Sequence, residues 1–76
     1  MKITQIIANP DFTLSITFDN GNSGLFDVKP YLNIEAFIKL NNIEEFNQVH
    51  SGGYFIEWEC GADLSADTIK ANLTVQ

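Results

Sequence analysis

The sequence predicts a single α+β domain: a mainly antiparallel sheet, built from a three-stranded meander plus a hairpin, with short helices on one face. Three observations predict this class. Apolar and polar residues alternate from Phe12 to Phe18, as in a half-buried strand. Glycine turns stand at Asn20-Gly21 and Gly52-Gly53, between strand-like segments. Helix-capping residues at Asn42 and Ser65 precede short segments of helical character.

The first strand is expected over the isoleucine-rich segment Lys2–Ala8, which the turn-forming residues Asn9-Pro10-Asp11 end. The second strand follows directly. Its apolar residues fall on one face with a period of two, and they are Phe12, Leu14, Ile16 and Phe18.

The turn at Asp19–Gly21 joins the second strand to the third, and its length sets the register. A two-residue loop would place Asp27 opposite the apolar Leu14. A three-residue loop with Gly21 in the left-handed conformation places Phe26 there instead. Residues opposite one another share a face of the sheet, so the three-residue loop is predicted.

Two short helices are expected after the third strand, which ends at Lys29-Pro30. Leu32–Phe37 is typical of the start of a short helix of about two turns, with Asn33 as its N-cap and Leu32 packed on Phe37. A second helix is predicted to start at Asn42, where Glu44-Glu45 favour the positive end of the helix dipole.

The last part of the chain predicts a hairpin and a helix. Gly52-Gly53 separates Val49–Ser51 from the strand Tyr54–Trp58. Ser65 is then expected to cap a helix from Ala66 to about Asn72.

Aromatic residues of the last predicted strand divide between its faces. Tyr54, Ile56 and Trp58 share one face and Phe55 lies on the other. We expect the Trp58 face to be core, because a chain this small needs its aromatic residues for burial, and Phe55 is then exposed. The alternative is that Trp58 anchors a partner at the surface.

Size and charge limit the classes of function. The 76 residues form one predicted domain with ten acidic and four basic side chains, a net charge of −6, and no arginine. The scattered lysines do not favour direct binding of nucleic acid or of an anionic membrane. An acidic domain suits a basic protein partner, although charge that serves only solubility is an equal alternative.

Chemistry-bearing residues are few. Asp63 and Asp67 could be imagined as an acid/base pair or cation site, but helix capping and the helix dipole explain them more simply. His50 has no second ligand at metal spacing, and Cys60 has no adjacent base. We therefore predict no catalytic, metal or cofactor site and no enzyme. The single cysteine and the absence of an apolar leader favour the cytoplasm.

A family resemblance covers almost the whole chain, from near residue 2 to near residue 70. Its motifs are Phe12-x-Leu14-x-Ile16-x-Phe18, Asp19-Asn20-Gly21, Phe26-Asp27-Val28-x-Pro30-Tyr31-Leu32, Phe46-x-x-Val49 and Trp58-x-x-Gly61-Ala62-Asp63-Leu64-Ser65-x-Asp67-Thr68. With these motifs the chain resembles the bacterial domain of unknown function 2442. Two usual prolines of the family are replaced, by Glu59 and Ala66, and the helix-turn-helix extension of some relatives is not expected.

The resemblance implies no settled activity. Genes of the family often stand beside a second small family of unknown function, number 4160, which looks like a toxin–antitoxin arrangement. The predicted function is therefore a non-enzymatic protein-interaction module, antitoxin-like, whose partner is the product of an adjacent gene.

The alternative function is a regulatory module that acts on transcription through a partner or a dimer. A small enzyme or ligand-binding domain requires a deep pocket holding Asp63 or His50. The candidate partner interface consists of Phe55, Trp58, Asp63 and Asp67. Strand addition at an open sheet edge is expected to accompany it, and a homodimer would cover such an edge.

Overall fold

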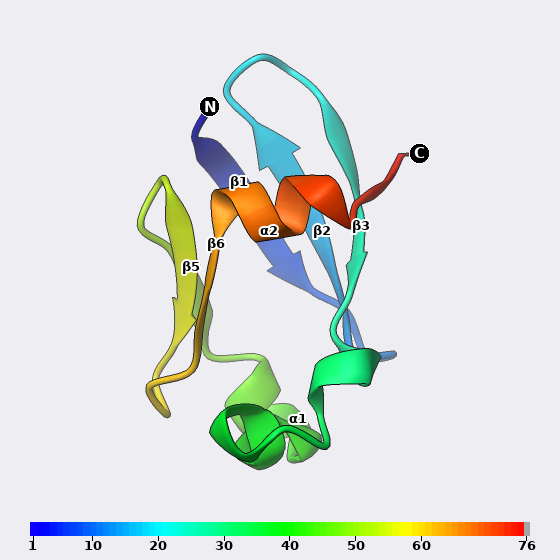
Figure 1. Cartoon of the computed structure of the whole chain (residues 1–76), viewed down its shortest axis with the longest axis vertical. Helices are drawn as coiled ribbons and strands as arrows, with labels where there is room; N and C mark the ends of the chain where they lie inside the picture. The colour runs from blue at the N-terminus through cyan, green and yellow to red at the C-terminus, as the bar shows by residue number, and fades with distance from the viewer. Residues whose placement is uncertain (76) are drawn as a thin grey trace.

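The computed structural model describes residues 1–75, and it confirms the α+β class with two antiparallel sheets and short helices (Figure 1). The strands are β1 (Ile3–Ala8), β2 (Thr13–Phe18), β3 (Ser23–Asp27), β4 (Val49–Ser51), β5 (Phe55–Trp58), β6 (Asp63–Ser65) and β7 (Thr74–Val75). The helical segments are the 3-10 helices η1 (Lys29–Tyr31) and η2 (Glu35–Asn41) and the α-helices α1 (Ile43–Phe46) and α2 (Ala66–Ala71).

The larger sheet has the strand order β1-β2-β3-β7. The predicted register of its central hairpin is confirmed, because Leu14 lies opposite Phe26. Phe18 N–H donates to Asn22 O at 2.9 Å across the three-residue loop, and Gly21 has the left-handed φ of +87°. The strand itself begins one residue later than expected, since Phe12 has a φ of +63°.

The smaller sheet has the order β4-β5-β6. Its first turn is shifted by one residue from the predicted Gly52-Gly53. Gly52 N–H donates to Phe55 O at 2.8 Å, so the two-residue connection is Gly53-Tyr54. Gly53 has a φ of +90°, as the first central position of a type II′ turn requires. Tyr54 is therefore 61% exposed in the turn and does not share the strand face of Trp58.

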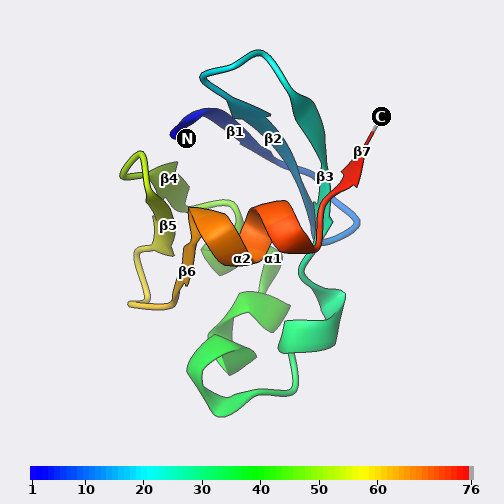
Figure 2. The ribbon, with the colours of Figure 1, turned by 45° about the horizontal axis from the view of Figure 1, so that its top comes forward.

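Two short strands were not expected from the sequence. Strand β6 has three residues and β7 has two, too few for a pattern to show. Strand β7 pairs with β3 at Gly24 (Figure 2). A Cβ atom at Gly24 would lie 2.8 Å from Leu73 Cγ. The segment that starts at Leu73 can therefore approach β3 this closely only because residue 24 is glycine.

Helix starts were predicted with mixed success. The Asn33 cap is wrong: η2 begins after Ile34, which is extended and provides no side-chain cap. The cap at Asn42 is confirmed, because its side chain accepts from Glu44 N–H at 3.0 Å. Ser65 is also confirmed as a cap, with Oγ accepting from Thr68 N–H at 3.1 Å.

One hydrophobic core joins the two sheets and the helices. Helix α2 lies across the face of the larger sheet, beside the smaller sheet, and the helical segments before β4 close one end (Figures 1 and 2). The largest fully buried side chains are Trp58, Phe26, Phe46, Leu14, Ile16, Leu40, Ile56, Ile69 and Val28. At the other end Ile3 N–H donates to Gly53 O at 2.8 Å, which ties β1 to the turn of the smaller sheet.

Candidate protein-interaction site

The smaller sheet turns one face to the core and one to solvent. Ile56, Trp58 and Leu64 are buried or half-buried on the inner face. Alternation along the strands places the opposite set on the other face. We call this set the outer face, and it consists of His50, Phe55, Glu57, Asp63 and Ser65.

A row of titratable side chains crosses the outer face. Glu57 pairs with His50 on one side and with Asp63 on the other. His50 Nε2 lies 3.0 Å from Glu57 Oε1, and His50 Nδ1 lies 3.8 Å from Glu59 Oε1. These side chains are about half exposed, so their pairing adds little stability. The three carboxylates leave this surface acidic.

An exposed aromatic side chain stands beside the acidic row. Phe55 is 42% exposed although it belongs to a strand, and it pairs with Ser65 on β6. Its ring covers Gly52 so closely that a Cβ atom there would overlap it. The neighbouring Tyr54 is also exposed, with Lys2 Nζ at 5.5 Å from its ring centre. Two exposed aromatic side chains thus lie at the hairpin turn and next to it, and Phe55 shares its face with the acidic row.

Trp58 does not belong to this surface. It is 1% exposed, and its indole N–H donates to Phe46 O at 2.9 Å. The expectation that it is core is confirmed. As a candidate contact residue Trp58 is therefore wrong, because no partner reaches a side chain sealed between β5 and α1.

The two aspartates of the candidate interface lie on different elements. Asp63 is exposed on β6, in register with Glu57. Asp67 is exposed in the first turn of α2, where its charge suits the helix dipole. The structure brings Phe55 and Asp63 to one face, and no hydrogen bond or ion pair of residues 1–75 joins Asp67 to either of them.

Sequence reasoning did not bring His50 and Glu57 together. It considered His50 as a possible metal ligand and did not pair it with a residue of the following strand. The signal that would have found the pair is the register of the hairpin: closing it at Gly52 and Phe55 sets His50 directly opposite Glu57.

The residues that the structure describes offer few other groups that could bind a metal or a ligand. Within residues 1–75 no three His, Cys, Asp or Glu side chains are grouped to hold a metal ion. The free thiol of Cys60 is half-buried. A hollow is present between β2 and the end of α2, but neither Asp63 nor His50 lines it. No helix of this part of the chain is long and apolar enough to cross a membrane.

Fold and surface together define a small acidic α+β domain with an aromatic and carboxylate face. Over residues 3–74 the chain matches the family described as protein of unknown function (DUF2442), and it belongs to that family. The resemblance noted from the sequence motifs is thereby confirmed. No curated protein and no solved structure matches the chain.

Proposed function

We propose that this protein is a non-enzymatic interaction module that binds a basic segment of a partner protein through its outer face. The observation that carries the proposal is Phe55, an aromatic ring left 42% exposed on a strand between Tyr54 and the carboxylates of Glu57 and Asp63. Aromatic residues are enriched among the residues that anchor protein interfaces.

Charge and aromatic surface suit the same partner. A lysine or arginine side chain can lie over the Phe55 ring and still reach the Glu57 or Asp63 carboxylate. The net charge of −6 speeds the approach of a basic protein. Affinity then comes mainly from the aromatic contact, and selectivity for basic sequences comes from the carboxylates.

In its specific form the proposal makes this chain the antitoxin-like neutraliser of a small protein encoded by an adjacent gene. This form is supported by the gene pairing that the family resemblance implies. Sheet edges offer a further contact, since β6 and β7 lie at the edges of their sheets and an open edge can accept an added strand.

The test is co-expression with the product of the adjacent gene, followed by co-purification and a growth assay. Phe55→Ala is expected to weaken the complex about tenfold or more, as for an interface anchor. The matched control is Ile38→Ala, because Ile38 is 51% exposed on η2, away from the outer face. For charge, Asp63→Asn is compared with Glu35→Gln on η2.

Failure of the neighbour to co-purify, together with its lack of toxicity, would count against the antitoxin-like form. Equal binding of the partner by the Phe55 and Ile38 variants would show that the partner does not bind through the outer face. Binding of operator DNA by the complex, but not by either protein alone, would favour the regulatory alternative.

A further inference from the structure

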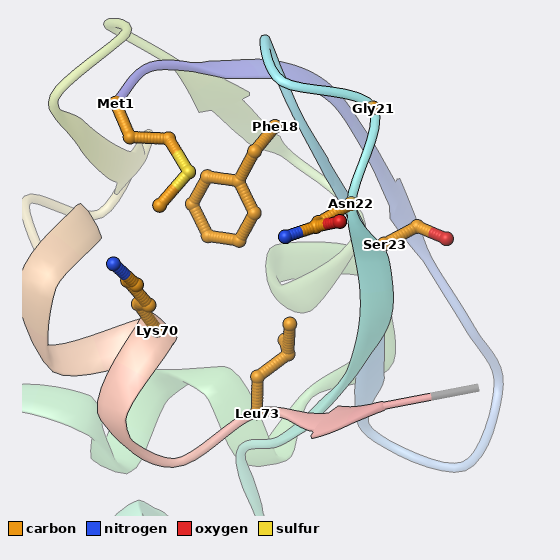
Figure 3. Close-up of a pocket in the computed structure, with 7 residues that line it drawn as sticks. All are labelled: Met1, Phe18, Gly21, Asn22, Ser23, Lys70 and Leu73. Atoms are coloured by element: carbon orange, nitrogen blue, oxygen red, sulfur yellow. The ribbon is translucent and has the colours of Figure 1, made fainter.

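A hollow of about 450 Å³ lies away from the outer face, between the β2–β3 hairpin and the end of α2 (Figure 3). Its size is within the range of small-molecule sites. The Phe18 ring, the Leu73 side chain and the Met1 side chain point toward the same space in Figure 3. Lys70 and Asn22 reach the space from opposite walls.

The hollow arises because α2 crosses the larger sheet below the β2–β3 hairpin loop (Figure 1). The apolar alternation of β2 continues to Phe18, the last residue of the strand. Helix α2 ends at Ala71, and the chain then turns so that Leu73 packs on Gly24. The helix therefore does not cover the end of the sheet at the hairpin loop, and the side chains of Met1, Phe18 and Leu73 line the gap there.

The charge of the lining is opposite to that of the molecule. The chain has ten acidic side chains and only four basic ones, yet among residues 1–75 Lys70 is the one charged side chain that lines the hollow. Within residues 1–75 the ion pairs involve Lys29 and His50, and no carboxylate lies within 4.0 Å of Lys70 Nζ. The Asn22 amide adds a second donor group on the facing wall.

We propose that the hollow binds a small molecule with an apolar body and a single carboxylate, such as a medium-chain fatty acid. The apolar body lies against Phe18 and Leu73, and the carboxylate accepts a hydrogen bond from Lys70 Nζ, while the Asn22 side-chain amide keeps the facing wall free of negative charge. A charge-assisted hydrogen bond selects the anion over a neutral molecule of the same shape. The proposal does not depend on the proposed function, since the two sites share no residue.

The experiment is a titration of the ¹⁵N-labelled chain with octanoate, and with octanamide as the neutral probe of the same length. Octanoate is expected to shift the amide signals of Phe18, Asn22 and Leu73 with a Kd of about 1 mM, and octanamide to bind about fivefold more weakly. Lys70→Gln is expected to remove that preference. The matched control is Lys39→Gln, which makes the same charge change on η2.

Asn22→Asp provides a second variant of unchanged size, and its new carboxylate is expected to weaken octanoate binding about fivefold or more. Three results would overturn the proposal. They are the absence of saturable shifts up to about 10 mM octanoate, equal affinity for octanoate and octanamide, and equal behaviour of the Lys70 and Lys39 variants.

Discussion

At the scale of single residues, the Asp11 carboxylate organises the turn that leads into β2. Thr13 Oγ1 donates to Asp11 Oδ1 at 2.6 Å, and Thr13 N–H donates to the same oxygen at 3.2 Å. The Thr13 hydroxyl is the largest cause that lowers the pKa of Asp11 below its ordinary value of 3.8. These hydrogen bonds stabilise the charged form of the carboxyl group, so the stability of the turn depends on pH.

The sign of the pH effect follows from the lowered pKa. The folded chain holds the Asp11 proton less tightly than the unfolded chain, so the stabilisation is complete above pH 3.8 and is lost as the pH falls through the folded pKa. In Thr13→Val we expect the pKa of Asp11 to rise, measured by NMR titration of the carboxyl carbon. Thr13→Ser keeps the hydroxyl and is the control; an unchanged pKa in Thr13→Val would contradict this account.

The position of a single side chain was predictable from the sequence where the need to bury apolar surface determines it. Trp58 was predicted to be core, and its burial is what a chain of 76 residues requires of its one tryptophan. Its hydrogen bond to Phe46 O was not predictable, because that bond depends on how α1 packs against β5. The exposure of Phe55 was predicted from alternation alone, whereas the cover that its ring gives Gly52 depends on the turn type.

At the scale of elements, the pairing of β7 with β3 depends on one glycine, Gly24. Gly24 is buried on β3, and a Cβ atom there would lie 2.8 Å from Leu73 Cγ. Gly24→Ala must therefore displace Leu73 and the start of β7. We expect the free energy of unfolding to fall by about 1–3 kcal/mol, as for other overpacked sites.

Urea unfolding measures this loss, and hydrogen exchange at Thr74 shows whether β7 has separated from β3. The control is Ser23→Ala, an exposed neighbour on the same strand, for which a change within about 0.5 kcal/mol is expected. Full stability of Gly24→Ala would mean that Leu73 moves at no cost and that β7 is not held by this contact.

Elements were predictable where a local pattern was strong. The alternation before Phe18 and the position of Gly21 fixed both strands of the first hairpin and its register. The second hairpin was misplaced by one residue because Gly52 and Gly53 both permit a turn. The 3-10 character of η2 and the strand β6 arise from packing against other elements, and such contacts leave no pattern in so few residues.

At the scale of the whole molecule, charge was predictable from composition but its distribution was not. The surplus of carboxylates was known from the sequence, and it suggested a basic partner. Only the register of the smaller sheet gathers Glu57 and Asp63 on a face with Phe55. Only the meeting of the β2–β3 hairpin with α2 leaves Lys70 in a hollow that no carboxylate of the described residues 1–75 lines. The outer face therefore depends on the register of local strand pairs, and the hollow depends on contacts between distant parts of the chain.

The acidic outer face makes a further prediction about association with the proposed basic partner. Attraction between opposite charges acts before contact and is screened by salt, so the association rate should fall about tenfold from low to high ionic strength. The double variant Glu57→Gln/Asp63→Asn should reduce this salt dependence more than Glu35→Gln/Glu44→Gln, which makes the same change of net charge on η2 and α1. Stopped-flow or surface-based kinetics at several salt concentrations measures both. If the two double variants show the same salt dependence, the attraction comes from the net charge of −6 and not from the outer face.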